Sequence, residues 1–504
     1  MLAFAAYHDG QPVEKWPENM ASRAYCIYLA DADDRPQERA FDTDTGRLAC
    51  YCPEHVRRRL FIRHHVNGFG DPILRTRLLH SGRALHNLSV ELALGRLELI
   101  NGERAKAALD DIEPSDALMQ KLNDAGTVAR QAAEIDAAGD PATAAMLADA
   151  SLAISVPAGE EFALELARER MARRARNGSL AGFRFGCTGG AFAAGTTRGA
   201  RFLEAFNYAT LPFYLSGMEP QPGDVRHEPV LASARELRSR GIALKGHPLV
   251  WTYTPCLPPH RRAMDFDTCC RVFRDRILRD VPPFRELIDY WDIINEAHDT
   301  PWANSFAFTS DQMVELTKMA GEATREAAPD ARLVVNVCLP FGEYAAGAPG
   351  RATTLEYVRS CIDAGVPFDI IGVQFYYGGG LLQYCWDMLE ISRILDEYAA
   401  LGKEVHITEL GTPSAMGPDP NAMIKEGNDV GLWHNEWNES TQADWVEQFY
   451  TICMSKEAIT AATWWSFSDA THVFWPHSGL LDKQDAPKDA FRRIVRLRET
   501  TGSR

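Results

Sequence analysis

The regular alternation of strand-like and helix-like segments from about residue 180 onward constrains the fold more than any other feature. Eight short apolar runs have the composition of buried strands: 183–188, 206–213, 243–251, 290–297, 332–337, 369–376, 404–410 and 462–469. Segments with helical periodicity, such as 311–328, separate them. Eight βα units in about 320 residues predict a (β/α)8 TIM barrel. A doubly wound open sheet is the alternative, although no Gly-x-Gly-x-x-Gly motif follows the first strand.

The region before the barrel has two parts with different patterns. Short alternating runs at 24–29, 47–51, 58–64 and 88–94, separated by Gly, Asp and Pro, predict a small β-sandwich-like module. An alanine-rich stretch follows, with a helix start at Ser115 and a helix stop at Gly178, and predicts two helices. The expected boundaries are 1–113 for the β-rich module, 114–178 for a helical linker and 179–504 for the catalytic barrel. The module either binds carbohydrate or serves only as a packing domain.

The composition narrows the range of partners. A net charge of −16 argues against nucleic acid and against an anionic membrane surface. No apolar run is expected to span a membrane. The 11 cysteines are odd in number and contain no CxxC pair, which favours a reducing, cytoplasmic location. Residues 1–10 do not resemble a signal peptide, which also favours that location. Secretion after removal of a signal peptide is the alternative. Nothing in the composition indicates the oligomeric state.

Two of the strand-like runs end in a glutamate. Glu296 closes 290–297 and Glu409 closes 404–410, the fourth and seventh candidate strands. The C-terminal ends of barrel strands carry the catalytic groups, and a pair of carboxyl groups is the minimum equipment for cleaving a glycosidic bond. Either glutamate alone is a weak signal. A regular strand would send Asn295 and Glu296 to opposite faces, so a bulge or turn is needed if both act.

Aromatic and amide side chains surround these glutamates in the sequence pattern. Flat rings stack on the C–H faces of sugar rings, while imidazole and amide groups bind hydroxyls. We therefore expect a site for an uncharged poly- or oligosaccharide, without metal or organic cofactor. Trp464 is assigned to the core. The candidate substrate-binding residues are His247, Trp251, Asn295, Gln374, Tyr376, Trp465 and Trp475.

Residues 180–495 resemble glycoside hydrolase family 10, the xylanase family. The resemblance rests on Gly246-His-Pro-Leu-Val-Trp251, on Trp291-Asp-Ile-Ile-Asn-Glu-Ala297 and on Ile407-Thr-Glu-Leu410. It implies a retaining endo-1,4-β-xylanase in which Glu296 is the acid/base and Glu409 the nucleophile. It also implies that Asn295, His247 and Gln374 bind the hydroxyls of the sugar under attack.

One motif of the family is altered. The turn Glu219-Pro-Gln-Pro-Gly223 is present, but Thr210, Leu211 and Tyr214 stand where the family has Glu, Asn and Lys. Those polar groups bind the next sugar on the non-reducing side. Tyr376 stands where a His is usual. The sequence therefore predicts a preference that differs from unsubstituted xylan. A non-catalytic carbohydrate-binding barrel and a clan relative acting on a different β-glycan are the alternatives.

Overall fold

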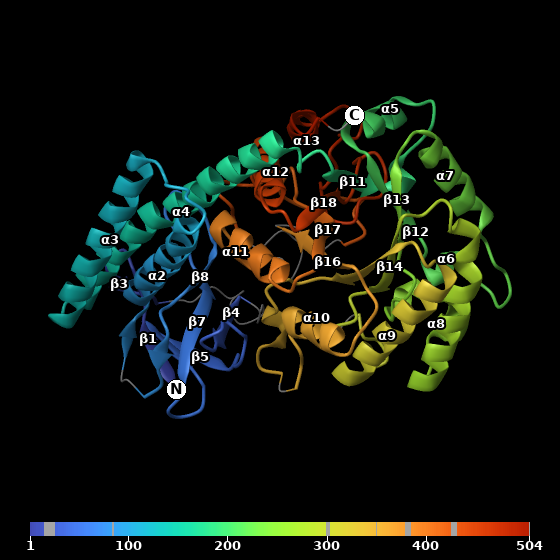
Figure 1. Cartoon of the computed structure of the whole chain (residues 1–504). Coiled ribbons are helices and arrows are strands. Elements are labelled where there is room, and N and C mark those ends of the chain that lie inside the picture. Colours follow the sequence, from blue (N-terminus) through green and yellow to red (C-terminus); the bar gives the residue numbers. More distant parts are fainter. Residues whose placement is uncertain are drawn as a thin grey trace.

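The computed structural model describes residues 1–14, 26–82, 85–298, 303–348, 350–377, 385–424 and 431–502. Eight parallel strands close into a barrel in sequence order, so the (β/α)8 prediction is confirmed and the open sheet is not observed (Figure 1). The barrel strands are β11 (Arg184–Thr188), β12 (Tyr208–Pro212), β13 (Ala243–His247), β14 (Tyr290–Asn295), β15 (Arg332–Val337), β16 (Ile370–Tyr376), β17 (Glu404–Gly411) and β18 (Ile459–Trp464).

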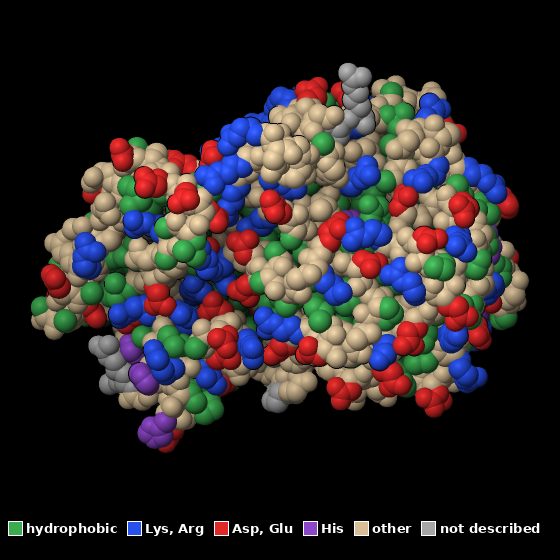
Figure 2. All heavy atoms as spheres, viewed as in Figure 1, with side chains coloured by type: hydrophobic (Ala, Val, Ile, Leu, Met, Phe, Trp, Pro, Cys, Tyr) green, Lys and Arg blue, Asp and Glu red, His purple; other side chains and the backbone are tan. Residues whose placement is uncertain are grey.

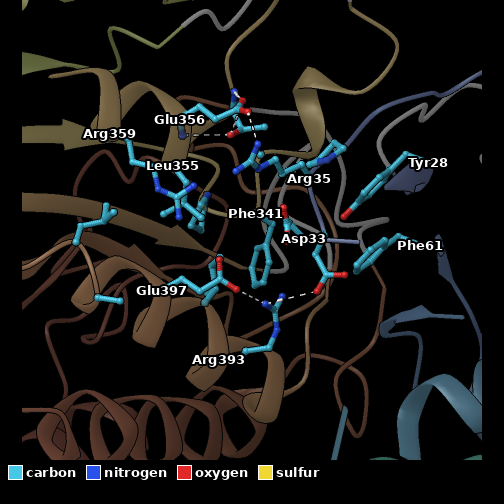
Figure 3. A pocket seen from close by; sticks show the side chains of 18 of the residues that line it. Tyr28, Asp33, Arg35, Phe61, Phe341, Leu355, Glu356, Arg359, Arg393 and Glu397 are labelled. Atoms are coloured by element: carbon cyan, nitrogen blue, oxygen red, sulfur yellow. Dashed lines mark hydrogen bonds and ion pairs between the residues drawn. The ribbon is translucent and has the colours of Figure 1, made fainter. Parts of the chain in front are cut away.

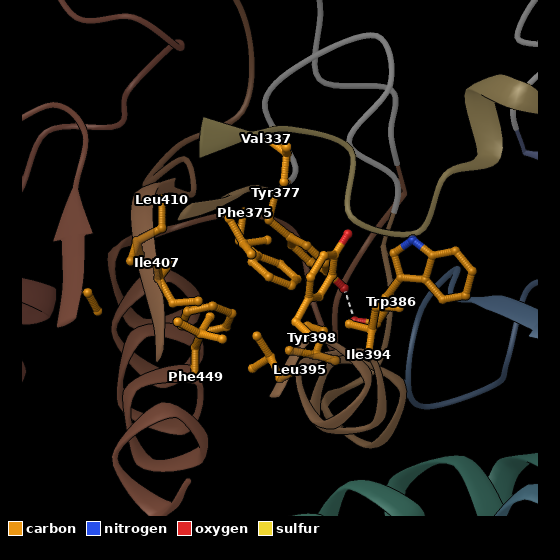
Figure 4. Packing of buried hydrophobic residues seen from close by; sticks show 14 of the residues in the cluster. Val337, Phe375, Tyr377, Trp386, Ile394, Leu395, Tyr398, Ile407, Leu410 and Phe449 are labelled. Atoms are coloured by element: carbon orange, nitrogen blue, oxygen red, sulfur yellow. Dashed lines mark hydrogen bonds between the residues drawn. The ribbon is translucent and has the colours of Figure 1, made fainter. Parts of the chain in front are cut away.

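Helices surround the barrel. They are α5 (Thr197–Ala205), α6 (Leu215–Met218), α7 (Glu228–Ser239), α8 (Phe266–Asp280), α9 (Ser310–Ala327), α10 (Thr354–Asp363), α11 (Met388–Ala399), α12 (Glu439–Ser455) and α13 (Asp489–Thr500). Several begin at a side-chain cap: Thr309 and Gln312 form a capping box at α9, and Thr353 and Glu356 form another at α10. Phe375 of β16, Leu395 of α11 and Phe449 of α12 pack in the layer between the strands and the helices (Figure 4).

The period-two geometry of the strands separates core residues from site residues. In β16, Phe375 faces the helices, so its neighbours Gln374 and Tyr376 face the interior of the barrel mouth. The prediction placed the last strand too far along the chain, at 462–469. β18 ends at Trp464, and Phe467 and Asp469 bond the backbone of Leu480 and Leu481 instead.

The N-terminal β-rich region is present as two four-stranded sheets and a short hairpin. One sheet has the order β10-β1-β6-β5, and the other has β4-β7-β8 with β9 paired to β7. The predicted run 24–29 begins outside the described residues. The strands are β1 (Leu2–Ala5), β2 (Tyr7–His8), β3 (Gln11–Pro12), β4 (Ile27–Ala30), β5 (Phe41–Asp44), β6 (Arg47–Cys50), β7 (Arg57–Arg63), β8 (Ile73–Arg75), β9 (Leu79–His80) and β10 (His86–Asn87).

The predicted strand at 88–94 is wrong, because this segment begins the helix α2 (Leu88–Ala108). The residues of its first half, 88–100, are buried on nearly all sides, so the sequence there shows no clear helical stripe. Packing decides the outcome: α2 lies against β8, and a side chain at Gly95 would collide with the carbonyl of Arg75. Tertiary contacts thus override an ambiguous local pattern.

The two predicted linker helices are confirmed as α3 (Asp116–Ala137) and α4 (Pro141–Asn177). Ser115 caps α3, and Gly178 ends α4 with a φ of 79°. Contrary to the sequence expectation, α4 is long and apolar enough to cross a membrane by length and composition. Half of the most apolar stretch of α4 is buried in the molecule, and the helix packs against α2, α3, α11 and α12. A helix in the core of a folded domain can have the same length and the same apolar composition.

Candidate active site

Glu296 follows β14 in a conformation that resolves the strand-face problem. The pairing of β14 with β15 shifts between Asp292 and Ile294, and Glu296 has a φ of 53°. Its backbone N–H donates to the carbonyl of Asn336 across 2.8 Å. The bulge and the left-handed residue turn Asn295 and Glu296 to the same region, where both are buried.

Glu409 lies two residues before the end of strand β17, also beside a register shift. Its carboxylate accepts hydrogen bonds from the hydroxyl of Tyr376 at 2.5 Å, from Nε2 of Gln374 at 3.2 Å and from Nδ2 of Asn336 at 3.3 Å. Gln374 also donates to Oδ1 of Asn295 at 3.2 Å. Gln374 therefore joins the end of β14 to the end of β17.

The ring of His247 is paired with the buried carboxylate of Asp292. Its Nδ1 lies 2.6 Å from Oδ2 of Asp292, and its Nε2 lies 3.6 Å from Oε1 of Glu409. Nζ of Lys245 lies 2.8 Å from the same Asp292 oxygen. Burial alone would raise the pKa of Asp292, but Lys245 and His247 hold that pKa below its ordinary value. A charged Asp292 fixes the ring of His247 toward the site.

Asp292, Lys245 and Asn336 are site-supporting residues that sequence reasoning missed. Each is a polar residue inside an otherwise apolar barrel strand: Asp292 in β14, Lys245 in β13 and Asn336 in β15. A buried polar group costs free energy unless it is paired, so such a residue in an apolar run is itself a signal of a polar network. That signal was available in the sequence.

The two glutamates have unequal surroundings. Burial raises the pKa of Glu296 to about 8, and the negative charge of Glu409 adds to the rise. Nearby Gln374, Trp251 and Asn295 oppose it only in part. Glu296 is therefore protonated at neutral pH, while Glu409 is surrounded by hydrogen-bond donors.

Aromatic rings line the site, as the sequence predicts. Half-buried Trp251 lies 6.0 Å from Tyr214 and 4.9 Å from Tyr253 between ring centroids. Trp465 lies 5.7 Å from His247, and Trp475 lies 5.5 Å from Tyr376. Trp464, by contrast, is fully buried and donates to the carbonyl of Ser478. The structure thus brings all nine sequence-predicted site residues to the mouth of the barrel.

The three altered positions before the Glu219 turn differ in location. Tyr214 is half-buried, and its ring meets His247 edge-on at 5.7 Å. Leu211 is buried in the core and packs near Gly189, on the helix side of β12. Thr210 is buried within the barrel. Of the three, Tyr214 contacts the site residues and was missing from the predicted site.

Comparisons with known proteins show which chains this one is similar to. A family model described as glycosyl hydrolase family 10 matches residues 215–497. The chain is 26% identical over 279 residues to endo-1,4-beta-xylanase A of Caldicellulosiruptor saccharolyticus, covering 51% of this chain and 75% of that protein. It is 25% identical over 327 residues to endo-1,4-beta-xylanase B of Paenibacillus barcinonensis, covering 59% and 91%.

Among solved structures, native xylanase 10B from Thermotoga maritima aligns with a TM-score of 0.49 at 20% identity, covering 64% of this chain and 96% of that one. The family match includes both glutamates and spans more than half of the 504 residues. The chain therefore belongs to glycosyl hydrolase family 10 and is a glycoside hydrolase.

Proposed function

We propose that this protein is a retaining β-glycosidase that cleaves the backbone of a xylan-like polysaccharide or its oligosaccharides. One observation carries the proposal: Glu296 and Glu409 end two strands on different sides of the barrel, and Gln374 links their surroundings in one buried network. Relatives named endo-1,4-beta-xylanases support the substrate class.

The unequal surroundings assign the two roles. Glu296, with a pKa of about 8, holds the proton that a leaving glycosidic oxygen needs at neutral pH. Glu409 presents a carboxylate oriented by Tyr376, Gln374 and Asn336. Glu409 attacks the anomeric carbon as Glu296 protonates the departing oxygen, which gives a covalent glycosyl-enzyme. Glu296 then takes a proton from water, and the water oxygen displaces Glu409 from the anomeric carbon with net retention.

The remaining site residues hold the sugar. His247, Asn295 and Gln374 bind hydroxyls of the sugar under attack, and Trp251, Trp465 and Trp475 supply flat apolar faces. Tyr376 orients Glu409 and packs beside Trp475.

We further propose that the preference differs from unsubstituted xylan. The phenol of Tyr214 occupies a position where the family has a lysine, beside His247 and Trp251. It replaces a cationic donor with a neutral, mostly apolar ring.

The catalytic unit is the barrel at 179–504, and the helical linker at 114–178 joins it to the β-rich module at 1–113.

A panel of β-1,4-xylans, glucans, mannans and galactans tests the proposal with wild type, Glu296→Ala and Glu409→Ala. We expect wild type to release products from at least one β-glycan and both variants to lose nearly all of that activity. Proton NMR of the first anomer released should show retention. Binding of a glycan without turnover by wild type would favour a non-catalytic barrel. Cleavage confined to glucan, mannan or galactan would assign a different substrate class.

A further inference from the structure

A large cleft lies where the N-terminal β-rich module meets the barrel. Its volume is about 770 Å³, within the range of small-molecule sites, and such sites occur preferentially at domain interfaces. Residues of β4 and the loop after it form one wall, and the loop after β15 together with α10 and α11 forms the other. The proposed catalytic residues Glu296 and Glu409 do not line it.

Contacts between the two units hold this cleft open in a fixed shape. Asp34 of the module lies 3.7 Å from Arg393 of α11. Within the module, Arg59 of β7 lies 3.1 Å from the same carboxylate and fixes its position. Gly347 donates its backbone N–H to the carbonyl of Gln37 at 2.7 Å. The contacts made by Arg393 and Gly347 join segments that are far apart in sequence, so the cleft is preformed rather than assembled on binding.

A flat aromatic surface stands inside the cleft. The ring of Phe341 is half-buried and lies parallel to Trp386, with centroids 3.9 Å apart and planes 9° apart. Trp386 is itself buried and supports Phe341 from behind. Figure 3 shows Phe341 in the middle of the cleft, between Arg35 and Arg393. A supported ring with an accessible face is suited to stacking on the C–H face of a sugar.

Charges of both signs surround this ring. The lining contains three arginines and four carboxylates: Arg35, Arg359, Arg393, Asp33, Asp34, Glu356 and Glu397. Two arginines already face carboxylates, since Arg35 lies 4.0 Å from Glu356 and Arg393 pairs with Glu397. Figure 2 shows basic and acidic side chains interspersed along the crease between the two lobes. Such a lining offers donors and acceptors together, which suits an uncharged polyhydroxyl ligand better than an anion or a cation.

A smaller cavity of about 30 Å³ adjoins this cleft on the side of β16. It shares Pro340, Phe341 and Trp386 with the cleft. Its other lining residues include Gln374 and Tyr376, both of which donate to Glu409. The aromatic surface is therefore adjacent to the catalytic network.

We propose that the cleft is a second glycan-binding site, built jointly by the N-terminal module and the barrel, that holds an uncharged sugar chain continuing from the catalytic centre. The inference rests on the proposed function for the identity of that chain. The proposed site gives the N-terminal module a role in binding long substrates. Phe341 provides the stacking face, and exposed Arg359 provides a donor at the rim.

The test measures binding rather than turnover, in a Glu409→Gln background, by calorimetric titration of β-1,4-xylo-oligosaccharides from disaccharide to octasaccharide. Phe341→Leu removes the flat ring but keeps an apolar side chain. We expect it to weaken binding of the longest oligosaccharides about tenfold and to leave the disaccharide unchanged. Arg359→Ala should weaken the long chains in the same direction. It gives a reading free of folding effects, because an exposed side chain contributes little to stability.

Tyr51→Ala is the control, because Tyr51 is an exposed aromatic residue of the N-terminal module outside the cleft. It should leave all affinities unchanged. The inference is overturned if Phe341→Leu and Arg359→Ala bind every oligosaccharide as the Glu409→Gln protein does, or if losses are equal for short and long chains. If wild type hydrolyses no β-glycan but binding still depends on length and on Phe341, the proposed function fails and the second site stands.

Discussion

The hydroxyl of Tyr376 donates to Oε2 of Glu409 across 2.5 Å, and both side chains are buried. Burial raises the pKa of Tyr376 well above its ordinary value, and the negative charge of Glu409 raises it further. The phenol therefore keeps its proton over the working pH range and acts only as a donor. A hydrogen bond to a carboxylate is stronger than one between neutral groups, so this contact fixes the orientation of the proposed nucleophile.

Tyr376→Phe should lower kcat/KM by roughly 10- to 100-fold, since a hydrogen bond to a charged group contributes about 1.5–3 kcal/mol. The ring packing against Trp475 is retained, so the midpoint of thermal unfolding should change little. Tyr376→His is the matched control, because an imidazole N–H can still donate. Equal rates for wild type and the Phe variant would show that the hydroxyl does not support Glu409.

The pKa of Glu296 predicts the alkaline limb of the pH–rate profile. A general acid must be protonated, and the pKa of Glu296 is about 8, so activity on natural glycans should fall as pH rises through about 8. Glu296→Gln should lose activity on natural glycans. It should retain formation of the glycosyl-enzyme from aryl glycosides with good leaving groups, without that alkaline limb. Stopped-flow release of the aryl group measures this, and an unchanged alkaline limb in the variant would assign the titration to another residue.

The same pKa predicts how folding stability depends on pH. The ordinary pKa of the carboxyl is 4.5 and its pKa in the folded state is about 8, so the folded state binds more protons between those limits. Its contribution to stability is complete below 4.5 and is lost as pH rises through about 8. Glu296→Gln lacks this titration. Its melting temperature relative to wild type should rise with pH across that window, as differential scanning calorimetry can show.

The sequence predicts the barrel well because buried parallel strands and amphipathic helices have distinct periods. It also predicts that Glu296 and Glu409 lie at the ends of two barrel strands, because an apolar run that ends in a glutamate is a local pattern. It cannot show that Glu296 has a φ of 53° or that β14 bulges, and both features turn Asn295 and Glu296 into one site. The prediction for 88–94 is wrong for a related reason: the first half of α2 is buried on nearly all sides, and its packing against β8 is not local information.

Tyr214→Lys tests the altered subsite. It restores the family's cationic donor at the one altered position that contacts His247 and Trp251. The ratio of kcat/KM on unsubstituted xylo-oligosaccharides to that on the preferred substrate should rise several-fold. An unchanged ratio would show that Tyr214 does not set the preference.

Leu211→Asn serves as the contrasting variant for the same motif. Leu211 is 1% exposed and packs in the outer core. An asparagine there loses apolar burial and leaves an amide without a partner, so the free energy of unfolding should fall by about 3 kcal/mol. Chemical denaturation measures the loss, which should come without a gain in activity on plain xylan. A stable variant with raised activity would mean that this position faces the sugar.

Asp292 links stability to catalysis, and a double variant separates the two. Asp292→Ala leaves Lys245 buried without its carboxylate, so the free energy of unfolding should fall by about 3–5 kcal/mol. Asp292→Leu combined with Lys245→Met removes both charges and should recover most of that stability. It should not recover activity, because Nδ1 of His247 loses the oxygen that orients the ring toward Glu409. Recovery of kcat/KM together with stability would show that Asp292 serves only the fold.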